Sequence, residues 1–176
     1  HDQLPTAPSV VSSTGKMYHG TGLRFEAFDE AALDGTALYG PGVYTTDDAG
    51  IAASYARNRS KKTGTPGSLQ NVAIPANARL LNLETSLPDD AVQALEQAAI
   101  RNESSYDVDA WDLAAKAARA GEPGKAVYAA FKDGLEDSIA TVADAAEALD
   151  ALNMVLRNAG YDGLAHIGGA AQGGKR

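Results

Sequence analysis

The sequence predicts an α+β fold. Short β-prone runs bounded by glycine and proline occur over 17–83 and again over 164–167, whereas 86–159 carries helical periodicity. The chain has 176 residues, of which 44% are hydrophobic and 22% are charged, and it contains no long apolar run. This composition is typical of a soluble globular domain with a hydrophobic core, and it excludes the disordered and membrane-spanning classes.

Four short strands are expected in the first part of the chain. The run KMYHGT ends at Gly20, and GVYTT follows the turn-forming YGPG. LQNVAI and ARLLNLE are two further β-prone runs. Pro75 separates them, because proline cannot donate a ladder hydrogen bond.

One helix is expected between the second and third of these strands. Thr46, Asp47 or Asp48 can cap it, and the two acids suit the positive end of the helix dipole. A loop, KKTGTPGS, is expected after it. Apolar or amphipathic residues at helical spacing are Ile51, Ala52 and Tyr55.

Four helices are expected in the middle of the chain. The first has Ser86 as its cap and Pro88 in its first turn, with Asp89 three residues after the cap. We expect Trp111 and Phe131 to lie in the core. The apolar face of the first helix holds Val92, Leu95 and Ala99, and that of the last holds Val142, Ala145, Leu149, Leu152 and Leu156. A final strand over 164–167 is expected after an Asp162-Gly163 turn.

The formal net charge is -8, and the acidity is concentrated in one segment. Residues 84–150 hold 15 acidic and 5 basic side chains. Because binding to nucleic acid needs clustered Lys and Arg, this balance favours a protein over a nucleic acid as macromolecular partner. One basic cluster, Arg57–Lys62, is either a solvated loop or a contact for a phosphate-bearing ligand or target.

Cysteine and histidine usage restricts the chemistry. The chain has no cysteine and three histidines, which excludes disulfides, thiol nucleophiles and thiolate metal sites. No metal-ligand spacing is present, so no metal is expected. Residues 1–16 are rich in Pro, Ser and Thr and do not resemble a signal peptide, so we expect a linker or an added arm there.

The pattern with chemical content combines YHGT at 18–21 with YGPGVYTTDDAGIAASYA at 39–56. Taken alone, His19 can be a structural histidine at a strand end, and Tyr44 suits a strand. Taken together, a strand tyrosine and a helix tyrosine eleven residues later, Tyr55, can hold their rings on either side of a flat ligand. A histidine beside Gly20 adds a side-chain hydrogen bond and accessible backbone groups. The pattern favours a ligand with a planar amide-bearing ring attached to a sugar.

These two motifs resemble those of the His-Tyr type of ADP-ribosyltransferases, the group that contains diphtheria toxin and the poly(ADP-ribose) polymerases. GPGVYTTDDAGIAASYA is similar to the family's Gly-x-Gly-x-Tyr strand, acidic helix start and Ala-x-Tyr helix. NVAIPANARLLNL and GYDGLAHIGG look like elements of small bacterial and phage-borne members. The resemblance implies a split antiparallel β-sheet core in a catalytic domain over 17–176, with the helical segment of about 86–159 as a variable insertion.

The resemblance implies a role for each matching residue. His19 would hydrogen-bond a ribose hydroxyl of NAD+. Gly20 would hold the nicotinamide carboxamide through its backbone, and Thr21 would lie close enough to assist. Tyr44 and Tyr55 would sandwich the nicotinamide ring. On this basis His19 and Tyr44 are the candidate catalytic residues, and all five are candidates for binding NAD+.

Two positions depart from the family pattern. Ala52 stands where many eukaryotic members have a serine that bonds the carboxamide. The third signature residue, usually Glu and sometimes Gln or Asp, opens a late strand in the family. Gln172 is the nearby candidate in this chain, and otherwise we expect that residue to follow Arg176.

The activity implied by the resemblance is mono-ADP-ribosyl transfer, in which NAD+ is a substrate. The enzyme would cleave the bond between nicotinamide and ribose and transfer ADP-ribose to a macromolecular acceptor. Two alternatives stay open: an NAD+ glycohydrolase, and an inactive binding module that keeps the NAD+ slot. The implied context is a bacterial or phage effector or toxin domain that acts in a target-cell cytoplasm, can meet an immunity or inhibitor protein, and has no membrane partner.

Overall fold

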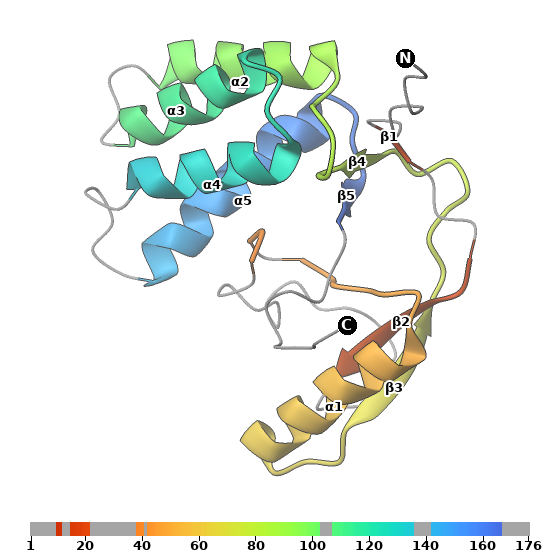
Figure 1. The fold of residues 1–176 in the computed structure, drawn as a ribbon. Coiled ribbons are helices and arrows are strands. Elements are labelled where there is room, and N and C mark those ends of the chain that lie inside the picture. The colour runs from red at the N-terminus through yellow and green to blue at the C-terminus, as the bar shows by residue number, and fades with distance from the viewer. Residues whose placement is uncertain are drawn as a thin grey trace, which may run out of the picture. The chain divides into compact units, whose positions relative to one another are not determined.

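A computed structural model describes residues 10–11, 15–21, 38–40, 42–102, 107–135 and 142–166. These residues form five α-helices and two small β-sheets, so the expected mixture of helices and sheets is confirmed (Figure 1). The chain divides into two compact units. We call them the helical unit, His1–Ser12 with Ala78–Arg176, and the hairpin unit, Ser13–Asn77. The predicted helical segment of about 86–159 falls within the helical unit, and the predicted domain start at Met17 falls within the hairpin unit.

The helical unit combines four helices with a three-stranded sheet. Its helices are α2 (Asp89–Arg101), α3 (Val108–Arg119), α4 (Gly124–Leu135) and α5 (Val142–Asn158). Its strands are β1 (Val10–Val11), β4 (Leu80–Asn82) and β5 (Gly163–Ala165), with β4 in the centre. β1 is antiparallel to β4, and β5 is parallel to it with Leu81 opposite Leu164. The four helices form the crossover that a parallel pair of strands requires.

The core of the helical unit holds large side chains in contact. Trp111 of α3 and Phe131 of α4 pack edge to face, with ring centroids 5.0 Å apart and planes at 76°. Both are buried, as expected, with exposed fractions of 3% and 0%. The predicted stripe of α5 is confirmed at its three leucines, which are all buried: Leu149, Leu152 and Leu156.

The predicted start of α2 is wrong. The helix begins at Asp89, with Pro88 as its N-cap in an extended conformation and with no side-chain capping bond. Ser86, the expected cap, lies in a β-bridge with Pro123. The backbone bonds of that bridge region, such as Gly124 N–H to the Thr85 oxygen at 2.9 Å, hold the chain extended before the helix starts.

A polar cluster in the helical unit joins β4, α2 and the end of α5. The Tyr161 hydroxyl donates to the Asp90 carboxylate, and Arg79 Nη2 lies 3.4 Å from the same carboxylate. The Arg79 guanidinium also lies 4.6 Å from the centroid of the Tyr161 ring. Burial, reinforced by the Asp90 carboxylate, raises the pKa of Tyr161 to about 12. The bond from Tyr161 lowers the pKa of Asp90 despite the opposing effect of burial.

In the described residues of the hairpin unit, the elements are β2 (Met17–Thr21), β3 (Ser68–Val72) and α1 (Ala49–Thr63). β2 and β3 are antiparallel, with Gly20 opposite Leu69. α1 packs on both strands. The expected helix cap is confirmed as Asp48, whose Oδ1 accepts from the backbone N–H of Gly50 at 2.7 Å and of Ile51 at 3.1 Å.

The helix α1 is longer than the sequence suggested. The prediction of a solvated loop at Arg57–Lys62 is wrong, because these residues belong to α1, which ends at Thr63 before Gly64. Basic residues favour this end of a helix because they offset the negative end of its dipole. No helix in the part of the chain that the structure describes has the length and apolarity needed to cross a membrane.

Candidate functional site

All five candidate residues lie in the hairpin unit. β2 carries His19, Gly20 and Thr21 at its C-terminal end. Tyr44 lies in the extended segment that precedes α1, and Tyr55 lies in α1 itself. The site can therefore be described within one compact unit.

Among the described residues, the segment around Tyr44 pairs with the edge of β2 away from β3 through one β-bridge. Tyr18 and Thr46 exchange two backbone hydrogen bonds, of 2.7 and 3.0 Å. The predicted strand GVYTT is therefore wrong except for this bridge, since 43–45 belong to no strand. The reason lies in Tyr44, whose backbone and side chain are bonded elsewhere.

The backbone oxygen of Tyr44 is bonded by the side chain of His19, with His19 Nδ1 2.8 Å from it. A carbonyl oxygen can only accept, so Nδ1 carries the proton in this bond. In the neutral imidazole, Nε2 then has the lone pair and is the hydrogen-bond acceptor. The structure thus joins the two candidate catalytic residues directly and fixes the tautomer that accepts from a hydroxyl.

The phenol of Tyr44 is bonded to the preceding turn. Its hydroxyl accepts from the backbone N–H of Tyr39 at 3.0 Å and donates to the backbone oxygen of Gly40 at 2.8 Å. Gly40 has a φ of 88°, a conformation that favours glycine. The backbone and the hydroxyl of Tyr44 are therefore both bonded, while the residue as a whole is 38% exposed.

Gly20 presents its backbone to the same edge of β2. Because the N–H and C=O of Tyr18 both bond Thr46, alternation along the strand directs the N–H and C=O of Gly20 to that edge as well. Continuing the Tyr18–Thr46 register would place Tyr44 opposite Gly20, but the Tyr44 oxygen bonds His19 instead. An N–H donor and a C=O acceptor of Gly20 therefore lie side by side where the ladder stops.

The missing side chain of Gly20 has a structural reason. A Cβ atom there would lie 1.9 Å from the backbone oxygen of Ala52 in α1. Gly67, before β3, has the same role, since its Cβ would lie 2.5 Å from the oxygen of Ala56. The two glycines let the backbone of α1 lie directly on the hairpin.

Tyr55 and Thr21 occupy the surroundings of this edge. Tyr55 is 48% exposed on α1, next to the buried Ala56. Since the Cα of Gly20 faces α1, alternation places the side chains of His19 and Thr21 on the opposite face of β2. The structure thus joins His19 to Tyr44 by a bond and places Tyr55 on the helix behind the strand.

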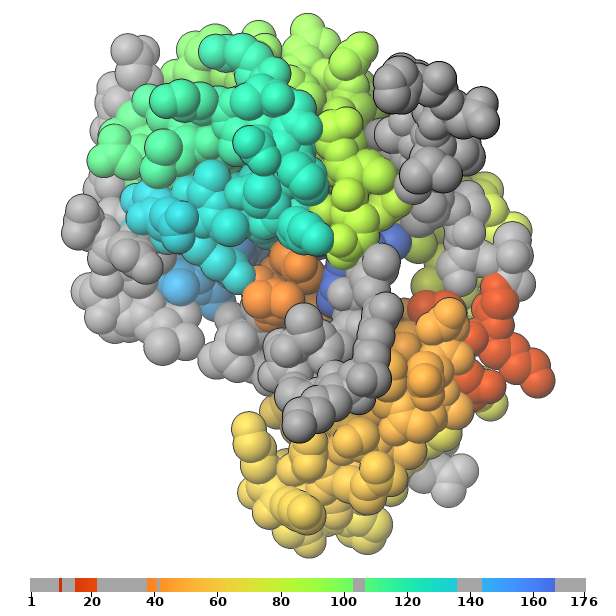
Figure 2. All heavy atoms as spheres, viewed as in Figure 1, coloured from red at the N-terminus to blue at the C-terminus, as the bar shows by residue number. Residues whose placement is uncertain are grey.

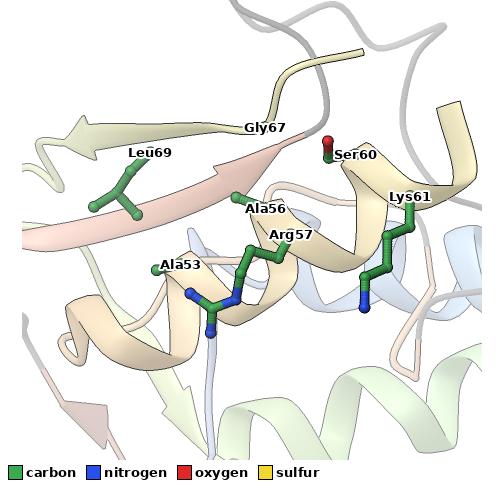
Figure 3. A pocket seen from close by; sticks show the side chains of 7 residues that line it. All are labelled: Ala53, Ala56, Arg57, Ser60, Lys61, Gly67 and Leu69. Carbon is green, nitrogen blue, oxygen red and sulfur yellow. The ribbon is translucent and has the colours of Figure 1, made fainter. Parts of the chain in front are cut away.

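A groove on the hairpin unit was not predicted from the sequence. It has a volume of about 440 Å³, lies open to solvent, and runs between α1 and the start of β3 (Figure 3). The sequence indicated its basic residues, Arg57 and Lys61, but not the apolar wall that Leu69 supplies from β3. The strand register that aligns β3 with α1 carries no signal in the local sequence. The lining residues are Ala53, Ala56, Arg57, Ser60, Lys61, Gly67 and Leu69.

Some of the predicted features lie outside the residues that the structure describes. Gln172, the candidate third signature residue, lies outside the described ranges, as do most of residues 1–16. Within those ranges, no three His, Asp or Glu side chains gather in a way that could hold a metal ion. Comparison of the chain with protein-family models, curated proteins and solved structures finds no match.

Proposed function

We propose that the chain is a mono-ADP-ribosyltransferase of the His-Tyr type, which cleaves NAD+ at the nicotinamide–ribose bond and transfers ADP-ribose to a macromolecular acceptor. The observation that carries the proposal is the bond between His19 Nδ1 and the Tyr44 oxygen, next to Gly20 in β2. It brings two separate sequence motifs together at one strand edge. The split antiparallel core of that enzyme family is part of the same proposal.

The polar groups at this edge complement the nicotinamide nucleoside. A carboxamide has one acceptor oxygen and an amino donor, and Gly20 offers one N–H donor and one C=O acceptor on the same edge. His19 Nε2, as an acceptor, suits a ribose hydroxyl. Tyr44 and Tyr55 are both exposed residues that would stack on the flat nicotinamide ring, with Tyr44 oriented by its two hydroxyl bonds.

The proposed reaction needs orientation more than acid catalysis. Nicotinamide leaves as a neutral molecule, while positive charge develops on the ribose as in glycoside cleavage. Holding the carboxamide and the ribose at fixed points aligns the bond that breaks, and a positioned polar group is worth about 10² to 10³ in rate. Transfer to a protein side chain or hydrolysis by water then depends on which acceptor reaches the sugar.

The test is release of nicotinamide from NAD+, measured by chromatography. We expect His19→Ala and Tyr44→Ala to lower the rate about 10²-fold or more, since each removes a positioned contact. His166→Ala is the matched control because it removes a histidine from the helical unit, and its rate should stay within about twofold of the unmodified chain. Circular dichroism checks that each variant is folded.

Labelled NAD+ distinguishes the two alternatives. If the label remains in free ADP-ribose and no macromolecule of a cell lysate carries it, the chain is an NAD+ glycohydrolase. If calorimetry detects NAD+ binding that Tyr44→Ala abolishes while no nicotinamide is released, the chain is a binding module. If NAD+ neither binds nor reacts, the proposal is wrong.

A further inference from the structure

The second half of α1 is a strongly basic surface. Arg57, Lys61 and Lys62 are exposed, and none of them forms an ion pair with another residue in the described part of the chain. The helix itself contains no acidic residue. Elsewhere the described cations are often paired, as in the Lys125–Glu84 ion pair of 2.6 Å. α1 forms much of one exposed face of the hairpin unit (Figure 2).

Two of these cations border the groove next to α1. Arg57 and Lys61 are four residues apart, so they project from the same face of the helix, and their charged ends extend in the same direction (Figure 3). The floor is apolar, formed by Ala53 and Ala56, and the opposite wall carries Leu69, which is 44% exposed. The groove therefore combines two positive charges on one rim with an apolar floor and an apolar opposite wall.

This combination fits an acidic protein segment better than a nucleic acid. A segment with carboxylates on both sides of an aliphatic residue matches both features, the charges at the rim and the apolar wall. Nucleic acid binding relies on many phosphate contacts, and single strands also stack on aromatic side chains. The residues lining this groove include no aromatic ring on which a base could stack.

We propose that the groove bordered by Arg57, Lys61 and Leu69 is a docking site for an acidic, leucine-like segment of a partner protein. The inference rests on the proposed function, because the docked partner would be the acceptor protein. The helix that lines the groove, α1, also carries Tyr55. A segment held there lies on the same compact unit as the proposed NAD+ site. The acceptor protein is thus selected by a surface separate from the residues that would hold NAD+.

The test measures peptide binding without NAD+, so it does not depend on catalysis. The probe is a fluorescein-labelled peptide with two glutamates on each side of a leucine, followed by anisotropy. We expect saturable binding at about 50 mM salt that weakens about tenfold at about 500 mM, because exposed charge pairs are screened. Arg57→Gln/Lys61→Gln should weaken binding about tenfold, from the loss of two exposed pairs. Leu69→Ser should weaken it as well.

The matched control is Arg101→Gln/Lys116→Gln, which removes two exposed cations from the helical unit and should leave peptide affinity within about twofold. The peptide with glutamine in place of glutamate, and the one with glycine in place of leucine, should both bind weakly. The proposal is overturned if the peptide does not bind, if the control variant loses as much affinity, or if single-stranded oligothymidine binds more tightly and loses affinity in the groove variant. Peptide binding without nicotinamide release would refute only the proposed function.

Discussion

Among the described residues, the large apolar side chains that are buried all lie in the helical unit, whereas the apolar residues buried in the hairpin unit are alanines. Of 23 buried hydrophobic residues in the described ranges, 21 belong to the helical unit, and the other two are Ala52 and Ala56. The exposed large apolar residues of the hairpin unit are Leu38, Val43, Tyr44, Ile51, Tyr55 and Leu69.

The difference shows which interactions stabilise each unit. Burial of a large apolar side chain contributes about 1.5 to 3 kcal/mol, far more than burial of an alanine methyl group. The hairpin unit relies instead on backbone contact through Gly20 and Gly67 and on side-chain bonds to the backbone, as at His19 and Asp48. Its exposed rings are then available for ligands, which agrees with the tendency of functional sites to depart from packing rules.

The largest expected effect is on the core of the helical unit. Phe131→Ala should lower the free energy of unfolding by about 3 to 5 kcal/mol, because it removes a fully buried ring in contact with Trp111. Urea denaturation followed by Trp111 fluorescence measures this effect. Tyr55→Ala, at an exposed ring, should change stability by less than about 0.5 kcal/mol. If Tyr55→Ala lowered the free energy of unfolding as much as Phe131→Ala, the two units would not differ in how their large apolar side chains contribute to stability.

The next effect concerns the close backbone contact of the hairpin unit. Gly20→Ala should cost about 1 to 3 kcal/mol, since its Cβ would collide with the Ala52 oxygen and force α1 away from β2. Amide hydrogen exchange in β2 and α1 reports the loosening. Gly15→Ala, where an added Cβ has no atom within 4 Å, is the control and should leave exchange unchanged. If the amides of β2 and α1 were equally protected from exchange in Gly20→Ala and Gly15→Ala, the contact of Gly20 with α1 would not stabilise the hairpin unit.

The same contrast explains which features were predictable from the sequence. Periodicity placed Leu149, Leu152 and Leu156 on the buried face of α5, because large apolar residues repeat where a helix faces a core. In the hairpin unit, β2 and a helix cap at Thr46, Asp47 or Asp48 were predicted, and the structure selects Asp48, since strand propensity and capping are local properties. The strand GVYTT was wrong, because bonds from His19, 25 residues away, and to Gly40 replace the ladder at Tyr44.

The features of the candidate site also fall into two groups, those that the sequence predicts and those that it does not. The motif spacing indicated His19, Gly20 and Tyr44 together, and the structure links His19 to Tyr44 by a bond that no spacing rule specifies. The contact of Gly20 with α1 and the wall that Leu69 gives to the groove depend on strand register and helix packing. Those are long-range properties, so a local reading of the sequence misses them.

An effect comparable to that of Gly20→Ala is expected in the polar cluster of the helical unit. Tyr161→Phe should cost about 1.5 to 3 kcal/mol at pH 7, since it removes a hydrogen bond to a charged carboxylate. The pKa of Tyr161 is raised, so its contribution is present below its ordinary value of 10 and is lost as the pH rises towards about 12. The pKa of Asp90 is lowered, so its contribution is lost as the pH falls below 3.8.

Urea denaturation across pH measures this linkage. The stability difference between the unmodified chain and Tyr161→Phe should shrink at both extremes of pH. Tyr128→Phe is the matched control, because the Tyr128 hydroxyl donates to the neutral amide of Asn153 at 2.5 Å. Its difference should stay constant from about pH 7 down to about pH 3, since no carboxylate titrates in that bond. A constant difference for Tyr161→Phe over the same range would contradict the assigned coupling to Asp90.

The smallest expected effect compares the two predicted helix caps. Asp48→Ala should cost about 1 kcal/mol, because the Gly50 and Ile51 N–H groups lose their acceptor at the start of α1. Asp48→Asn should keep most of the stability, since asparagine caps as well as aspartate. Ser86→Ala should change the free energy of unfolding by less than about 0.5 kcal/mol, because Ser86 caps no helix. Because α1 buries only two alanines, its first turn depends on this cap, and hydrogen exchange at Ala52 and Ala53 should rise in Asp48→Ala alone.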